Sequence, residues 1–149
     1  MYKHILIPTD GSTLSDQAVE HGIALAKRLG AKVTGVTVTT PFPIFSYEAG
    51  FTPVPQKYED EFNAFADSVV AGFKKVAASQ GVQCNALKVE HEHPYLAILS
   101  AAKREGCDLI LMASHGRRGI SAVVLGSETQ KVLTHSTIPV LVYRGAPSA

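Results

Sequence analysis

Short apolar runs along this 149-residue chain alternate with longer segments in which apolar positions recur every three or four residues. The runs are rich in Val, Ile, Leu and Thr, which is typical of β-strands, and the recurring positions are typical of amphipathic helices. Glycine, proline and small polar residues separate the segments, as expected where strands and helices end. The pattern predicts strands over residues 3–8, 31–39, 82–89, 107–113 and 138–143.

Amphipathic helices are predicted between these strands. Gly30 and Gly81 follow the first and second helices, where a left-handed residue commonly ends a helix. Pro94 suits the first turn of the third helix, and Gly126 precedes the fourth. The positions expected to face the core are Ala18, Gly22, Leu25, Ala26 and Leu29; Phe62, Phe65, Val69, Phe73 and Val76; Tyr95, Ile98, Leu99 and Ala102; and Val132 and Leu133.

Residues 41–56 break this alternation. They contain four prolines, Gly50 and several aromatic residues, and they show no period. We expect a mobile loop carrying apolar surface, which would suit a lid or an interface.

Strands that alternate with helices imply right-handed βαβ units. The fold class predicted is α/β, with a single doubly wound open sheet of five parallel strands and helices on both faces. In strand order 3-2-1-4-5 the strand at 107–113, which is almost continuously apolar, is covered on both faces. The length suits one domain over residues 1–149.

Composition and charge exclude several classes of protein. Hydrophobic residues make up 46% of the chain and charged residues 18%, which argues against disorder and coiled coil. The net charge is +1 and no basic stripe stands out, so we expect neither nucleic acid nor a membrane surface as a partner. The apolar runs fall far short of the roughly 20 residues that span a bilayer. We therefore expect a cytoplasmic protein, since the first strand begins at once, without a signal-peptide pattern.

The two cysteines, Cys84 and Cys107, form no CxxC motif. Both lie in or beside apolar segments, so free thiols in a reducing compartment are expected. In strand order 3-2-1-4-5 their strands are not neighbours, and no disulfide should join them.

Candidate chemistry lies at the carboxyl ends of the first and fourth strands, where parallel sheets hold their ligands. Residues 8–12 follow the first strand, residues 113–119 follow the fourth, and Gly126 and Ser127 start a helix. Small residues let backbone N–H groups approach an anion, and a helix N-terminus favours negative charge. Neither GxxxxGK[ST] nor GxGxxG occurs, so the two commonest phosphate loops are excluded.

These segments resemble the universal stress protein family. The resemblance rests on residues 5–12, on Ser114-His115-Gly116 followed after nine residues by Gly126-Ser127, and on residues 138–142. It covers almost the whole chain in the right order. Family members that bind ATP have Gly, two residues, Gly, nine residues, then Gly with Ser or Thr. Gly116, Gly126 and Ser127 match that pattern, whereas Ala113 replaces the first glycine, where a methyl group would crowd the ribose or be harmless at negative φ.

The resemblance implies a binding site for ATP or AMP, with cyclic AMP as a further ligand and Mg²⁺ or Mn²⁺ arriving with the phosphates. Asp10 and Val38 would form the adenine pocket, with Asp10 accepting from the amino group or a ribose hydroxyl. The full set of expected site residues is Pro8, Thr9, Asp10, Val38, Met112, Ala113, Ser114, His115, Gly116, Arg117, Arg118, Gly119, Gly126, Ser127, Glu128 and Thr129.

Simpler interpretations stand beside these. Asp10 would be an ordinary turn or N-cap residue, and Ser127 would cap its helix whether or not phosphate is bound. Arg117 and Arg118 would be solvated unless one reaches the terminal phosphate. His115 beside Ser114 has no GxSxG elbow to support a catalytic triad. His91-Glu92-His93 offers two ligands on one face and no third for a metal ion.

The function expected is therefore that of a nucleotide-binding stress-response protein whose bound state carries the signal. Two alternatives stay open: a slow ATPase or self-phosphorylating protein, and an interaction module that binds no nucleotide. The last strand, residues 138–143, is expected at the sheet edge. The resemblance implies a homodimer joined antiparallel through it.

Overall fold

The computed structural model describes residues 1–41, 46–47, 50–51, 55–116 and 124–145. Its helices are α1 (Thr13–Leu29), α2 (Gln56–Ser79), α3 (Pro94–Glu105) and α4 (Ser127–His135). The strands of its main sheet are β1 (His4–Pro8), β2 (Lys32–Thr39), β5 (Cys84–Glu90), β6 (Leu109–Ala113) and β7 (Val140–Tyr143). A short antiparallel pair joins β3 (Ser46–Tyr47) and β4 (Gly50–Phe51).

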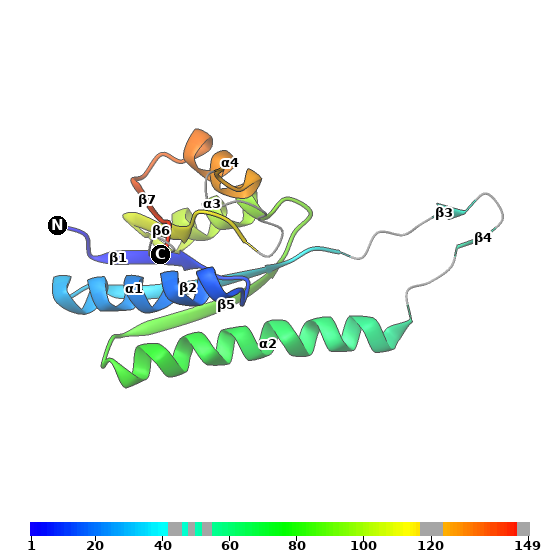
Figure 1. Cartoon of the computed structure of the whole chain (residues 1–149), viewed down its shortest axis with the longest axis horizontal. Helices are drawn as coiled ribbons and strands as arrows, with labels where there is room; N and C mark the ends of the chain where they lie inside the picture. Colours follow the sequence, from blue (N-terminus) through cyan, green and yellow to red (C-terminus); the bar gives the residue numbers. More distant parts are fainter. Residues whose placement is uncertain (42–45, 48–49, 52–54, 117–123, 146–149) are drawn as a thin grey trace.

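The main sheet confirms the predicted topology. Within the described ranges its strands are all parallel, in the order β5-β2-β1-β6-β7, which is the order 3-2-1-4-5 expected for the five main strands. β1 lies at the centre, with β5 and β7 at the two edges. Helices α1 and α2 lie on one side of the sheet and α3 and α4 on the other (Figure 1).

Each face of the sheet has its own core, because successive strand residues point to opposite faces. On the α1/α2 face, Ile5, Ile7 and Leu111 pack against the two helices. On the α3/α4 face, Leu6, Val36, Ile110 and Met112 do the same, with Val132 of α4. All five residues of β6 are buried, as its continuous apolar run predicted.

The ends of the first two helices follow the sequence. Gly30 ends α1 with a φ of 67°, and Gly81 follows the C-cap of α2 with a φ of 69°, a conformation that suits glycine. Gly106, which the sequence analysis did not single out, ends α3 with a φ of 68°. Pro94 is the first residue of α3. The Ser12 hydroxyl accepts from the N–H of Ser15 and caps α1.

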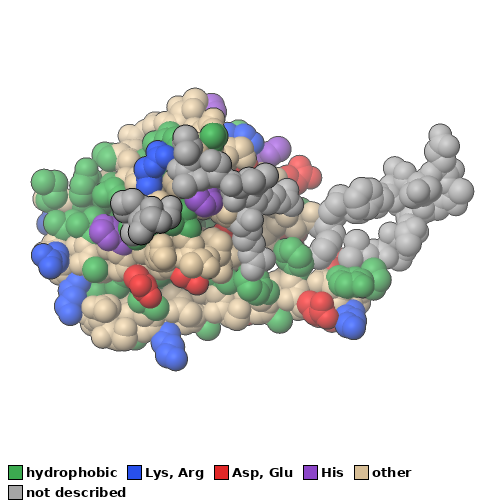
Figure 2. All heavy atoms as spheres, in the orientation of Figure 1, with side chains coloured by type: hydrophobic (Ala, Val, Ile, Leu, Met, Phe, Trp, Pro, Cys, Tyr) green, Lys and Arg blue, Asp and Glu red, His purple; other side chains and the backbone are tan. Residues whose placement is uncertain are grey.

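Four residues expected to face the core are exposed instead. Phe62 and Phe65 on α2 are 50% and 39% exposed, Leu133 on α4 is 41% exposed, and Leu29, the last residue of α1, is 36% exposed. Helix α2 has 24 residues, about 36 Å at 1.5 Å per residue, and its N-terminal half runs past the strands it covers (Figure 1). Hydrophobic side chains are visible at that end of α2 in the space-filling view (Figure 2). Leu133 is one position beyond the fully buried Val132, so the helical turn carries it out of the core.

The segment 41–56 is the other difference from the sequence analysis. The antiparallel pair of β3 and β4 lies within it, although no period predicted regular structure there. The other residues of 42–54 lie outside the described residues. The mobility expected of that loop therefore stays a prediction.

Both cysteines are free thiols, as expected. Cys84 is on β5, which β2 and β1 separate from β6. Burial, together with the charges of Glu105 and Asp108, raises the pKa of the Cys107 thiol to about 12, so this side chain behaves as part of the core. None of the helices in the described part of the chain is both long and apolar enough to cross a membrane.

Candidate functional site

The candidate site lies beyond the carboxyl ends of β1 and β6. The chain leaves β1 through α1 toward β2 on one side, and it leaves β6 through α4 toward β7 on the other. In doubly wound folds a divergence of this kind marks the place where ligands bind, and we refer to this place as the crevice between the two strands. The residues predicted for the site come mainly from the β1–α1 turn and the β6–α4 connection.

The β1–α1 turn is held by short side-chain hydrogen bonds. The N–H of Ser12 donates to Asp10 Oδ1 (2.9 Å), and the N–H of Asp10 donates to Ser15 Oγ (3.1 Å). The Ser15 hydroxyl donates to Thr9 Oγ1 (2.7 Å), and the Thr37 hydroxyl donates to the Thr9 carbonyl (2.6 Å). Asp10 therefore has the turn-forming role that the simpler interpretation gave it, and this role fixes its carboxylate at the crevice.

Ser15 and Thr37 are functional supports that the sequence analysis missed. Both are buried, and their hydroxyls hold the turn that carries Asp10. A threonine in a buried strand is a signal that could have been noticed, because a buried hydroxyl needs a hydrogen-bond partner.

Gly116 and Gly126 lie where a side chain would collide with its surroundings. A Cβ on Gly116 would meet Asp10 Oδ2, although the two residues are far apart in sequence. A Cβ on Gly126 would come within 3.1 Å of His115 Cα. Gly126 has a φ of −60°, so the requirement for glycine there comes from space and not from backbone conformation. The two glycines bring the backbone after β6 close to Asp10 and to the start of α4.

The end of β6 is tied to α4 and β7. The N–H of Gly126 donates to the Ser114 carbonyl (2.7 Å), and the Thr129 hydroxyl donates to the Ala113 carbonyl (3.0 Å). The N–H of Ser114 donates to the Tyr143 carbonyl (2.8 Å). Ser127 is the first residue of α4, so the N-cap position that the simpler interpretation gave it belongs instead to Gly126, which has no side chain to cap the helix. The start of α4 is thus fixed beside the strand end with its first N–H groups at the crevice.

Ala113, which replaces a glycine of the ATP-binding pattern, packs into the core of the α1/α2 face. Its methyl group points away from the face that holds Met112. Across the described ranges no residue other than glycine has positive φ, so this alanine carries no backbone strain.

The other predicted site residues are distributed around the crevice. Val38 and Met112 belong to the core of the α3/α4 face. Glu128 is directed at α3, where it accepts from the N–H of Tyr95 (2.9 Å), so its carboxylate caps a neighbouring helix. Pro8 ends β1. Arg117, Arg118 and Gly119 lie outside the described residues.

Two alternative chemistries have little geometric support. Ser114 Oγ and His115 Nδ1 are hydrogen-bonded (3.2 Å), but Ser114 is only 2% exposed and is not presented to a substrate. The N–H of His93 donates to His91 Nδ1 (2.8 Å), which occupies one of the nitrogens a metal ion would need. In the part of the chain that the structure describes, no group of three or more His, Cys, Asp or Glu is arranged to hold a metal ion.

Comparison with known proteins gives one family by sequence and by structure. The model of the universal stress protein family matches residues 1–144. Universal stress protein MJ0531 of Methanocaldococcus jannaschii is 31% identical over 146 residues, which are 97% of this chain and 83% of that protein.

Solved structures share the fold over nearly the whole chain. Hypothetical protein MJ0577, described with a structure-based assignment of its biochemical function, is 29% identical with a TM-score of 0.83 and covers 99% of each chain. A universal stress protein in complex with cAMP is 23% identical, with a TM-score of 0.70 over 95% of this chain and 96% of that one. The universal stress protein of Archaeoglobus fulgidus in complex with dAMP is 16% identical, with a TM-score of 0.66 over 95% and 97%. At these identities the last two show likeness of fold alone.

Proposed function

The chain belongs to the universal stress protein family, and we propose that it binds ATP or AMP in the crevice between β1 and β6. The observation that carries the proposal is the tight approach at Gly116 and Gly126, where a Cβ would strike Asp10 or His115. This approach brings a carboxylate acceptor and the start of α4, whose N-cap residue Gly126 has no side chain, to one crevice. An adenine nucleotide offers matching groups, a base with N–H donors at one end and an anion at the other.

The adenine and ribose would lie at Asp10, between the ends of β1 and β2. The carboxylate of Asp10 can accept from the amino group of the base or from a ribose hydroxyl. Val38 near the end of β2 and Met112 near the end of β6 supply apolar surface. Two universal stress proteins of the same fold are described in complex with cAMP and with dAMP, which have the adenine base in common. Cyclic AMP is therefore a further candidate ligand.

The phosphates would lie at the start of α4. N–H groups at a helix N-terminus and the helix dipole both favour an anion there. Ser127 can donate its hydroxyl and its N–H to this anion. Mg²⁺ or Mn²⁺, where needed, would be held mainly by the phosphate oxygens, since hard divalent cations of this kind bind through substrate phosphates.

We propose that the bound state itself carries the signal in a stress response. The chain would act as one nucleotide-binding domain in the cytoplasm, as a homodimer joined through β7. A slow ATPase or self-phosphorylating activity is the alternative within the same site, and it would appear as release of phosphate or as a labelled chain. A module that binds no nucleotide is the alternative outside it.

Calorimetric titration of ATP, AMP, cyclic AMP and adenosine into the purified chain tests the proposal. Ser127→Ala should weaken binding of the phosphorylated ligands about 10- to 100-fold, because a hydrogen bond to a charged group contributes roughly 1.5–3 kcal/mol. Gly126→Val should weaken it at least as much. Ser127→Thr, which keeps the hydroxyl, is the matched control, and circular dichroism checks the fold of each variant.

The outcomes separate the hypotheses. If the wild-type chain binds none of these ligands at millimolar concentration, the nucleotide proposal is wrong and the interaction module takes its place. If Gly126→Val binds ATP as well as the wild type does, the phosphates lie elsewhere.

A further inference from the structure

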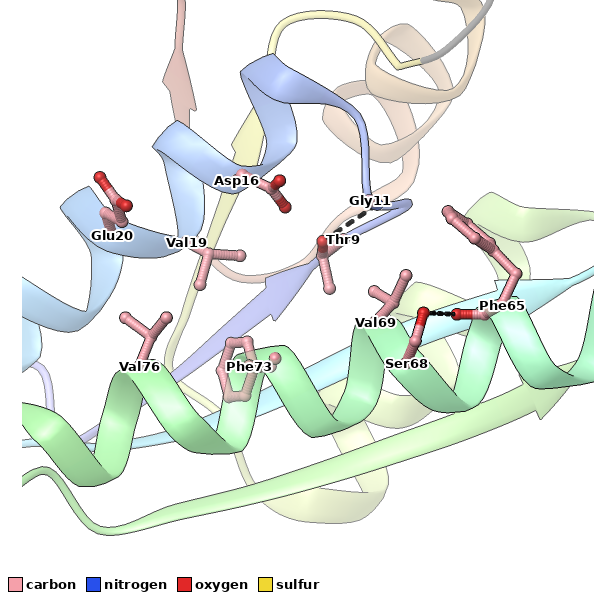
Figure 3. Close-up of a pocket in the computed structure, with 11 residues that line it drawn as sticks. Thr9, Gly11, Asp16, Val19, Glu20, Phe65, Ser68, Val69, Phe73 and Val76 are labelled. Carbon is pink, nitrogen blue, oxygen red and sulfur yellow. Dashed lines mark hydrogen bonds between the residues drawn. The ribbon is translucent and has the colours of Figure 1, made fainter.

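A groove runs between α1 and α2, on the outer side of one face of the sheet. Its volume is about 340 Å³. Val19 on α1 and the side chains of Phe73 and Val76 on α2 point toward each other across it, with the β1–α1 turn at one end (Figure 3). The α2 wall is mainly apolar: Phe65, Val69, Phe73 and Val76 line it, together with Gly72 and the hydroxyl-bearing Ser68. The α1 wall carries two carboxylates, Asp16 and Glu20, on either side of Val19.

This groove is separate from the crevice of the proposed nucleotide site. Val38 and Met112 face the α3/α4 core, whereas the groove lies on the α1/α2 face of the same sheet. Of the residues expected to hold a nucleotide, only Thr9 borders the groove. Two carboxylates on one wall also make it a poor place for the anionic end of a nucleotide.

The acidic wall has no neutralising ion pair within the described residues. Asp16 and Glu20 are four residues apart and so lie on the same side of α1. Among the residues that the structure describes, neither carboxylate forms an ion pair. Burial, together with the charges of Asp10 and Glu20, raises the pKa of Asp16 above its ordinary value. A bound cation would relieve this repulsion.

We propose that the α1–α2 groove is a second ligand site, for a small organic cation whose ammonium group faces Asp16 and Glu20 and whose apolar body packs on α2. The volume falls in the range of known small-molecule sites, roughly 300–1,000 Å³. Phe65 and Phe73 can contact the body of the ligand, and an aromatic face also attracts a cation. The site combines a mostly apolar surface with a few charged groups that fix orientation, as such sites commonly do. It does not depend on the nucleotide proposal.

Gly72 provides a way to close the groove without disturbing the core. It borders the groove on α2, and a Cβ placed on it would meet nothing within 4 Å. Leucine and alanine both favour a helix interior over glycine. Gly72→Leu should therefore fill the groove while the helix stays intact. Gly72→Ala is the matched control, because it raises the helix propensity at this position but occupies little of the groove volume.

Three probes with the same aromatic body and different charge test the proposal. They are 2-phenylethylammonium, the neutral 2-phenylethanol and the anionic 3-phenylpropionate, each titrated into the nucleotide-free chain and followed by amide chemical shifts. We expect the ammonium to bind at least ten times more tightly than the alcohol and the carboxylate to bind most weakly. The shifts should centre on the amides of Val19, Val69 and Val76.

The variants decide whether the groove is the site. Gly72→Leu should abolish the shifts and Gly72→Ala should keep them. The double variant Asp16→Asn/Glu20→Gln should bind 2-phenylethylammonium no more tightly than it binds 2-phenylethanol. Equal binding of all three probes, shifts centred away from the groove, or unchanged binding to Gly72→Leu would each overturn the proposal. ATP titrated into Gly72→Leu is a separate measurement, so a failed nucleotide proposal would be visible independently.

Discussion

His4 is a buried polar residue at the start of β1, and its imidazole is held by β2. Its Nε2 and the Thr34 hydroxyl oxygen are 2.7 Å apart across the two strands. Burial lowers the pKa of His4 below its ordinary value of 6.5, and the charge of Lys32 adds to this, outweighing the opposing effects of Glu105 and Asp108. The folded chain therefore keeps this imidazole neutral at a pH where the unfolded chain already binds a proton.

The first prediction follows from that difference. Stability from His4 is fully present above about pH 6.5 and decreases as the pH falls toward the lowered pKa of the folded state. Urea unfolding at about pH 7.5 and about pH 5.5 should show a larger loss for the wild type than for His4→Gln. His93→Gln, at an exposed position, is the control and should lose as much as the wild type. Equal losses for His4→Gln and the wild type would refute the assignment.

Asp10 carries the second prediction. Asp10→Ala should weaken ATP and adenosine binding by similar factors, because the proposed contact is to the base or ribose and not to the phosphates. Asp10→Asn retains an oxygen that can accept from the N–H of Ser12, so it keeps the turn while losing the charge. Calorimetry on both variants separates the turn from the contact. A loss confined to ATP would place Asp10 at the phosphates instead.

At the scale of elements, two glycines on helices offer a controlled comparison. Gly72 lies inside α2, and Gly106 ends α3 with a φ of 68°. A Cβ on either glycine meets nothing within 4 Å, so the two sites differ in backbone conformation and not in space. Gly72→Ala should raise the free energy of unfolding by about 0.8–1 kcal/mol. Gly106→Ala should lower it by about 1–2 kcal/mol, since the left-handed conformation is costly for alanine. Urea denaturation measures both changes, and a stabilising Gly106→Ala would contradict the argument.

The sequence pattern predicted the elements well because strands and helices differ in period. Leu6 and Ile7 point to opposite faces of a strand that is buried on both, and Gly30 and Gly81 mark where the first two helices end. Phe62 and Phe65 share the period of Phe73, yet only Phe73 is buried. Periodicity reports which face of a helix is apolar, and it does not report whether the sheet extends beneath that face.

The sequence pattern predicted less of the candidate site than of the fold. Gly116 approaches Asp10 from a segment that is distant in sequence. The periodicity of apolar positions is local and cannot predict such an approach, so only the resemblance to a family placed both residues in one site. Ser15 and Thr37 support the turn through hydroxyl hydrogen bonds, and such residues are common in helix starts and strands. Glu128 sits beside the motif residue Ser127, but it caps α3, which only the packing of two helices reveals.

At the scale of the molecule, the two edges of the sheet differ in how well they can pair with another strand. β5 carries Lys88 and Glu90, and Lys88 forms an ion pair with Asp67 (2.6 Å). Charged side chains on an edge strand discourage pairing with another chain. β7 has the uncharged sequence Val-Leu-Val-Tyr, and all four of its residues are only half-buried in the single chain. The edge at β7 is therefore the better surface for a second copy.

The last prediction tests this edge. Val142→Asp places a charge on β7 at a half-buried position, so a dimer joined through this strand should dissociate into monomers. Asn85→Asp adds a charge at an exposed position on the other edge strand and should leave the dimer intact. Light scattering at tens of micromolar gives the mass of each, and circular dichroism checks that both variants fold. A monomeric wild type at that concentration would rule out the homodimer. A dimer that survives Val142→Asp and is lost in Asn85→Asp would move the interface to β5, where Lys88 and Asp67 would have to be accommodated between the two copies.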